Sequence, residues 1–130
     1  MSGSWEIREQ KSVLAYSLHT DSTTLAWAYG IKNLILPGQH LPLAGMPFDH
    51  ARNAACMRCL EGGFTHILSI DSDVIPPHDA VLRLLAHNVP IVSAVYCRRS
   101  PPHGVPVAIR NGSWVANLPA KGLIEVDVVG

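Results

Sequence analysis

The segment His66-Ile-Leu-Ser-Ile-Asp-Ser-Asp-Val-Ile-Pro-Pro77 decides the fold that we expect for this chain. A short apolar run leads to two carboxylates, Asp71 and Asp73, and then stops at two prolines. Alternate residues of an extended chain point to the same side, with Cα atoms about 6.6 to 6.8 Å apart. The pattern therefore predicts a central buried strand over 66–70, with both carboxylates on one side just beyond its end.

The two carboxylates allow two interpretations. Like charges on one side repel each other unless a cation lies between them, and Mg²⁺ is usually held by one or two carboxylates together with substrate phosphates. Asp71 and Asp73 would then hold Mg²⁺ or Mn²⁺ on a diphosphate. Alternatively, Asp-Ser-Asp is turn chemistry, because these side chains bond nearby backbone groups where strands end. The flanking strand and helix favour the first, since open α/β sheets bind ligands beyond the carboxyl ends of their strands.

Predicted strands and helices alternate along the first three quarters of the chain. Val, Leu, Ala and Tyr form a first strand, and Asp49 is placed to act as N-cap of a later helix that Gly62-Gly63 would end. The alternation predicts a single α/β domain over 1–130, with a mostly parallel sheet and helices on both faces. The expected strands are 11–18, 41–44, 66–70 and 90–96, and the expected helices are 23–31, 48–60 and 77–87.

After Cys97 the pattern changes to short apolar segments separated by Asn-Gly and Lys-Gly turns. These turns favour hairpins. We therefore expect a short C-terminal β meander with strands over 105–110, 113–117 and 123–129.

Composition limits the classes of partner. Lys plus Arg and Asp plus Glu each total 10 in 130 residues, so no net charge attracts nucleic acid or a membrane surface. No apolar run approaches the ~20 residues that a membrane helix needs. The N-terminus lacks the basic-then-apolar layout of a signal peptide. A cytoplasmic protein with no transmembrane segment and no nucleic-acid partner is the expectation.

Ala51-Arg52-Asn53, followed by Asp71-Ser72-Asp73 and by Pro90-Ile-Val-Ser-Ala-Val-Tyr96, bears on the family. Together with Val74 to Leu85, this ordered set resembles the GT-A glycosyltransferases of the family-two type, most closely their compact bacterial, phage and metagenomic members. The likeness runs from about Val13 to the last residue. It implies a Rossmann-like GT-A nucleotide-diphospho-sugar transferase core.

The resemblance implies roles for particular residues. Asp73 would be the main metal ligand, and Asp71 would approach the ribose, or the metal through water. His19, Thr20 and Asp21 would line the nucleoside pocket, although compact relatives commonly have a Pro-Thr turn from which His19-Thr20 departs. The bound Mg²⁺ or Mn²⁺ would stabilise the charge that develops on the diphosphate leaving group.

Further candidate residues are basic or lie late in the chain. Arg52 could reach the diphosphate or brace the acidic loop, since an arginine fork suits phosphates and carboxylates, or it is a solvated helix residue. Arg98 follows the strand expected over 90–96 and could contact phosphate at the same edge. Family members usually continue into more sheet and helix that bring a catalytic base. Here Asp127 and Glu125 are the late carboxylates, and the sequence does not identify a catalytic group.

Three functions are compatible with these residues. The leading one is a metal-dependent glycosyltransferase, or its donor-binding core, that transfers a sugar from a nucleotide-diphosphate sugar to an unknown acceptor. A nucleotidyltransferase is less consistent, because His19-Thr-Asp-Ser22 stands where a glycine-rich phosphate loop would follow the first strand. A non-catalytic nucleotide-sugar-binding or assembly module is the third.

The last predicted strand also favours self-association. Leu123 to Val129 is apolar at five of its positions, which are Leu123, Ile124, Val126, Val128 and Val129. An exposed edge of this composition pairs readily with another chain, so we expect a homo-oligomer. The alternative is that Glu125 and Asp127 protect a solvated edge.

Overall fold

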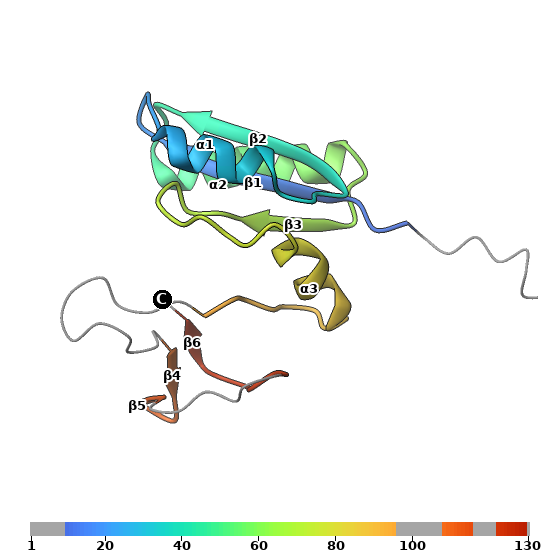
Figure 1. The fold of residues 1–130 in the computed structure, drawn as a ribbon, viewed down its shortest axis with the longest axis vertical. Helices are drawn as coiled ribbons and strands as arrows, with labels where there is room; N and C mark the ends of the chain where they lie inside the picture. The colour runs from blue at the N-terminus through green and yellow to red at the C-terminus, as the bar shows by residue number, and fades with distance from the viewer. Residues whose placement is uncertain (1–9, 96–107, 116–121, 130) are drawn as a thin grey trace, which may run out of the picture. The chain divides into compact units, whose positions relative to one another are not determined.

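The computed structural model describes residues 10–95, 108–115 and 122–129. The chain divides between Leu82 and Arg83 into two compact units, a division that falls within the short helix α3 (Ala80–Ala86). Each unit has its own three-stranded sheet (Figure 1). In chain order, the elements of the first unit before α3 are β1 (Val13–His19), α1 (Leu25–Lys32), β2 (Gly38–Ala44), α2 (Phe48–Glu61) and β3 (His66–Ser69).

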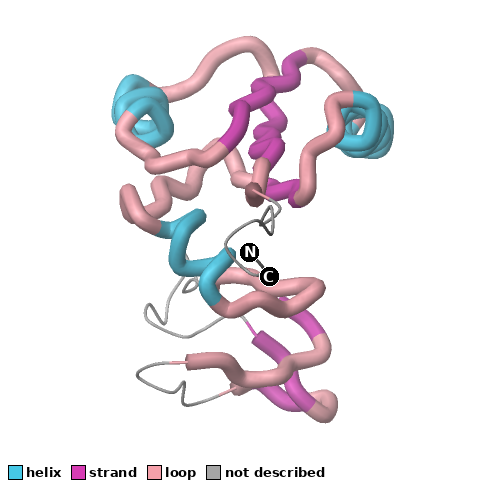
Figure 2. The backbone as a smooth tube through the Cα atoms, turned by 90° about the vertical axis from the view of Figure 1, so that its right-hand side faces the viewer, coloured by secondary structure: helices cyan, strands magenta, loops and turns pink. Residues whose placement is uncertain are grey.

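The sheet of the first unit is parallel throughout and has the order β2-β1-β3. β1 runs alongside β2 from the pair Val13 and Gly38 to the pair His19 and Ala44. Helices lie on both sides of this sheet (Figure 2). The first unit is thus α/β with a parallel sheet, as the alternation of strands and helices predicts.

The core of the first unit is centred on β1. Its residues from Val13 to Ser17 are all buried, which is what a continuous apolar run between two layers of helix predicts. α2 contributes small side chains to this core, and α1 contributes Trp27. The buried residues outside β1 are Trp27, Leu34, Ala51, Ala55, Cys59, Ile70 and Val81.

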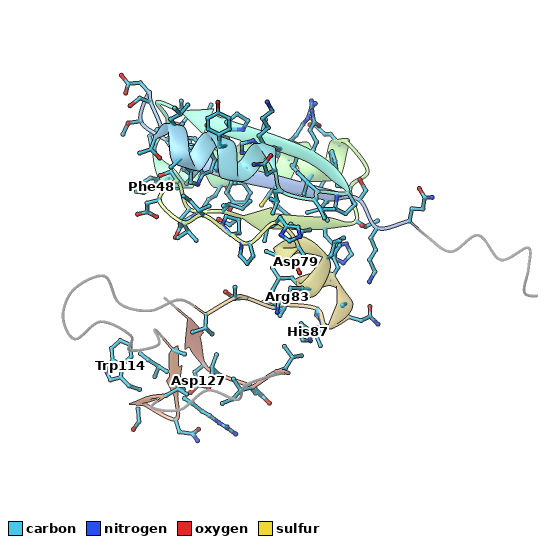
Figure 3. All side chains as sticks on the ribbon, in the orientation of Figure 1. Phe48, Asp79, Arg83, His87, Trp114 and Asp127 are labelled. Carbon is cyan, nitrogen blue, oxygen red and sulfur yellow. The ribbon has the colours of Figure 1, made fainter. Side chains whose placement is uncertain are left out.

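The helix ends agree only in part with the sequence-based expectations. Thr24 caps α1, and its hydroxyl accepts a hydrogen bond from the Trp27 N–H at 3.1 Å. The N-cap of α2 is Pro47, so the prediction of Asp49 as N-cap is wrong. Asp49 instead lies in the first turn, where a carboxylate still favours the positive end of the helix dipole. Gly62 ends α2 as predicted, and exposed Phe48 begins it (Figure 3).

Two expectations about the sheet are wrong. β3, expected as the central buried strand, is an edge strand in the described residues and is mostly exposed, and β1 is the central strand. Residues 90–95, expected as a fourth strand, belong to no strand, and Ile91 is 93% exposed; Tyr96 lies outside the described residues. An apolar run shows that a segment suits a strand, but a strand also needs a neighbour to bond with, and the run does not specify that neighbour.

The second unit contains a small antiparallel sheet. Its strands are β4 (Ala108–Arg110), β5 (Ser113–Trp114) and β6 (Val128–Val129), in the order β5-β4-β6. β4 and β5 are joined at Asn111 and Gly112, which have φ of 52° and 78° as a tight Asn-Gly hairpin requires. The expected strands over 105–110 and 113–117 extend partly beyond the described residues.

The end of the second unit differs from the predicted meander. β6 pairs with β4 rather than β5, and residues 123–127 are not a strand. The reason is a pair of bonds made by Asp127. Its carboxylate accepts from the Asn111 N–H at 2.7 Å, and its own N–H donates to the Ile109 carbonyl at 2.8 Å. These bonds place the chain along the edge of β4 opposite to β5, where β6 follows. Self-association through Leu123–Val129 stays a prediction.

Among the helices of the described ranges, none is long and apolar enough to span a membrane.

Candidate functional site

The carboxylates that follow β3 lie in a turn, which we call the acidic turn (Asp71–Val74). The Val74 N–H donates to the Asp71 carbonyl at 3.1 Å and closes it. The carboxylates of Asp71 and Asp73 belong to exposed residues, and Ser72 is half-buried. The expectation that Asp71 and Asp73 alternate along an extended chain is therefore wrong. The backbone of Asp-Ser-Asp therefore forms a turn. Cation binding depends on the two carboxylates, which the turn leaves exposed.

Trp27 of α1 explains why the chain turns at this point. Its indole N–H donates to two carbonyls of the acidic turn, those of Asp71 at 3.1 Å and Val74 at 3.0 Å. Trp27 is only 4% exposed, so this donor is removed from water and needs a partner inside the protein. One N–H shared between two carbonyls holds both ends of the turn. The backbone between Asp71 and Val74 consequently bends toward α1.

The acidic turn lies at the carboxyl edge of the parallel sheet. Ser69 pairs with Tyr16, and the next residue of the chain, Ile70, still donates its N–H to the Tyr16 carbonyl at 3.0 Å. β1 ends at His19. The acidic turn and the segment after β1 therefore lie at the same edge of the sheet, as the sequence predicts. This is the edge at which open α/β sheets bind ligands.

A pocket of about 470 Å³ opens beside this edge, and we call it the first-unit pocket. Its lining is mostly apolar, with His19, Asp21, Lys32 and His40 as titratable groups. Two of the three residues expected to line a nucleoside site, His19 and Asp21, belong to it, whereas exposed Thr20 does not. The remaining lining residues are Ser22, Thr23, Trp27, Ala28, Ile31, Pro42 and Ala44.

Two imidazoles of the first-unit pocket share one buried hydroxyl. The Ser17 Oγ lies 2.8 Å from the Nε2 atoms of both His19 and His40, and Ser17 is fully buried. A hydroxyl has one proton and two acceptor lone pairs, so it can donate to at most one of the two rings. At least one of the two imidazoles therefore donates its Nε2–H to the Ser17 oxygen. Trp27 packs against both, with ring centroids 4.8 Å from His19 and 5.8 Å from His40.

This arrangement predicts a pH-dependent stability. Burial, and then the neighbouring His19, lowers the pKa of His40 below its ordinary value of 6.5. The unfolded chain then binds a proton at higher pH than the folded chain, so the free energy of unfolding falls as the pH drops below about 6.5. The free energy of unfolding stops falling once the pH is below the pKa of His40 in the folded chain. Urea unfolding at a series of pH values between 8 and 5 should show this decrease.

His40→Asn should reduce that decrease, because the substituted residue has no proton to gain. His50→Asn is the matched control, since His50 is an exposed histidine of α2 in the same unit. An identical pH dependence in the wild type and in His40→Asn would contradict the assignment.

The remaining predicted site residues are Arg52, Arg98, Glu125 and Asp127. Arg52 is exposed on α2, and Arg98 lies outside the described residues. Glu125 and Asp127 belong to the second unit, where both line a hollow of about 690 Å³. The Asp127 carboxylate also holds the Asn111 turn, which gives it a structural role there.

Trp27, Ser17 and His40 could not be recognised as site residues from the sequence. Each carries no local signal, because no motif surrounds a single Ser or His in a strand or a single Trp in a helix. Their importance comes from contacts between residues far apart in the chain, such as Trp27 with Val74. Within residues 10–95, 108–115 and 122–129, His, Cys, Asp and Glu form no group of three suited to hold a metal ion.

Comparison with protein-family models, with curated proteins and with solved structures found no match to this chain. Its function is therefore argued from the geometry of the site.

Proposed function

We propose that the first unit binds a nucleotide-diphosphate sugar through a divalent cation, and that the chain is a metal-dependent glycosyltransferase or its donor-binding core. The nucleoside would occupy the first-unit pocket. Asp71 and Asp73 would hold Mg²⁺ or Mn²⁺ on the diphosphate. The acceptor is not specified by this geometry.

One observation carries the proposal: a mostly apolar pocket and a turn with two exposed carboxylates occur at one edge of a parallel sheet, joined by Trp27. The pocket suits a flat ring, since binding sites of this size are largely apolar with a few polar groups that fix orientation. The turn suits the charged part of the same ligand. A molecule with both parts is a nucleoside diphosphate.

The donor atoms of the acidic turn fit a hard cation. Carboxylate oxygens are ligands that Mg²⁺ and Mn²⁺ accept, and Mg²⁺ commonly takes its other ligands from phosphates and water. In the part of the chain that the structure describes, the two carboxylates have no third His, Cys, Asp or Glu grouped with them, which suits a cation that arrives together with a diphosphate. When bound, the cation would neutralise charge on the departing diphosphate. Asp71 and Asp73 would orient it, and Trp27 would fix the backbone that carries them.

Calorimetry on the full chain tests the proposal. We would titrate it with ADP, GDP, CDP, UDP and TDP, each with MnCl₂ and again with EDTA. At least one nucleoside diphosphate should bind about tenfold or more tightly with Mn²⁺, because a metal bridge contributes several kcal/mol. Equal binding with EDTA, or no binding by any of the five, would contradict the proposal.

Catalysis is a separate question from donor binding. Release of the nucleoside diphosphate from the matching sugar donor, with water as acceptor, would distinguish an enzyme from a non-catalytic binding module. Tight Mn²⁺-dependent binding without release would favour the module.

A further inference from the structure

Trp27 lies between two parts of the first unit, the acidic turn and the first-unit pocket. Its indole N–H is bonded to the carbonyls of Asp71 and Val74, and its ring lines the first-unit pocket. The same ring meets the His19 imidazole edge-on, with an interplanar angle of 72°. One rigid bicyclic group thus contacts the pocket and the backbone of the acidic turn.

We propose that Trp27 is a positioning residue that couples the first-unit pocket to the acidic turn, so that filling the pocket raises the affinity of the turn for a divalent cation. The proposal rests on the proposed function in one respect, namely that the cation binds at Asp71 and Asp73. It adds that the two halves of the ligand site are not independent.

The Trp27 ring has little freedom to move. Trp27 is 4% exposed, and its backbone N–H is fixed by Thr24 at the start of α1. A ring held in this way cannot shift without changing its two hydrogen bonds to the acidic turn. The indole N–H bonds the carbonyls at both ends of the turn, so its position restrains the backbone on which both carboxylates sit.

The sign of the coupling follows from conformational entropy. A planar group in the pocket limits the remaining motion of the Trp27 side chain, and with it the motion of the turn that the indole holds. A cation that binds afterwards orders less of the protein than it would in the empty state, which makes its binding more favourable. By linkage, the cation must raise the affinity for the pocket ligand by the same factor. Couplings of this kind are typically about 5- to 150-fold.

A nucleoside without phosphates makes the test specific. Such a molecule can fill the pocket but has no phosphate oxygens for the cation, so any change in Mn²⁺ affinity has to pass through the protein. We would measure the Mn²⁺ dissociation constant of the full chain from the electron paramagnetic resonance signal of free Mn²⁺. Each titration would be made without nucleoside and with adenosine, guanosine, cytidine, uridine or thymidine.

In the wild type, the nucleoside that binds should lower the Mn²⁺ dissociation constant about fivefold or more. Trp27→Phe keeps an aromatic ring but removes the N–H donor. It should raise the dissociation constant measured without nucleoside and reduce the effect of nucleoside to less than about twofold. Trp114→Phe is the matched control, because Trp114 is 58% exposed in the second unit (Figure 3) and should behave as the wild type.

Hydrogen exchange of the Val74 amide gives a second measurement that needs no metal. This N–H closes the acidic turn, so its exchange rate reports how often the turn opens. Nucleoside should slow the exchange in the wild type, and Trp27→Phe should accelerate it. The wild-type comparison remains decisive even if Trp27→Phe does not fold.

The outcomes separate this inference from the proposed function. The wild type could bind both Mn²⁺ and a nucleoside, with neither changing the affinity for the other. That result overturns the coupling and leaves the proposed function standing. Retention of the coupling in folded Trp27→Phe overturns the role of Trp27. If the wild type binds neither probe, the proposed function and the coupling both fail. Faster exchange of the Val74 amide in Trp27→Phe would then show only that Trp27 positions the turn.

Discussion

Replacing Asp73 by alanine is expected to weaken Mn²⁺-dependent binding of a nucleoside diphosphate about 100-fold or more. The proposed cation is held by only two protein carboxylates, so loss of one removes half of its protein ligands. A metal bridge to a diphosphate is worth several kcal/mol, and each 1.4 kcal/mol is a factor of ten in affinity. Calorimetry with the nucleoside diphosphate that binds the wild type measures the change.

Two control variants accompany Asp73→Ala. Ser72→Ala alters the same turn but removes no carboxylate, and Glu61→Ala removes one exposed negative charge at the end of α2. Both should change the dissociation constant by less than about threefold, because an exposed charge outside the site contributes little to a local interaction. An effect of Asp73→Ala no larger than that of Ser72→Ala would mean that the segment serves only as a turn.

The second large effect concerns stability. Leu14 is fully buried in the central strand of the first unit, between β2 and β3. Leu14→Ala should lower the free energy of unfolding by about 2 to 5 kcal/mol, since it removes buried methyl groups and leaves a cavity. Urea unfolding followed by circular dichroism measures the difference.

Leu60→Ala is the same chemical change at an exposed site. Leu60 is 78% exposed on α2, so its truncation should alter the free energy of unfolding by no more than about 0.5 kcal/mol. Comparable losses in Leu14→Ala and Leu60→Ala would contradict the placement of the core around β1.

The features that follow from local patterning could be predicted from the sequence. The buried run of β1, the helix that ends at Gly62 and the hairpin at Asn111-Gly112 are all specified by neighbouring residues. Parallel pairing also follows, because each strand is separated from the next by a helix. The carboxyl-edge position of Asp71 is a consequence of these local features.

The features that depend on distant contacts could not be predicted. Whether Asp71 and Asp73 continue the strand or enter a turn is decided by Trp27, which lies far earlier in the chain. The apolar run over 90–95 has the composition of a strand, and its composition does not say whether a neighbour pairs with it. The shared hydroxyl of Ser17 depends on β1 and β2 being aligned in one register, which brings His40 beside it.

The central position of β1 has a kinetic consequence. β1 is the first strand of the described residues, yet both of its neighbours are made later. The Ser12 N–H, just before β1, donates to the Thr65 hydroxyl, just before β3, across 53 positions. Contacts so distant in sequence close slowly, because the loop between them must first lose its freedom. During synthesis, β1 can therefore pair first with β2 and must wait for β3. Until β3 is made, one edge of the apolar strand β1 has no strand to pair with. An unpaired apolar edge favours aggregation of the growing chain during this interval.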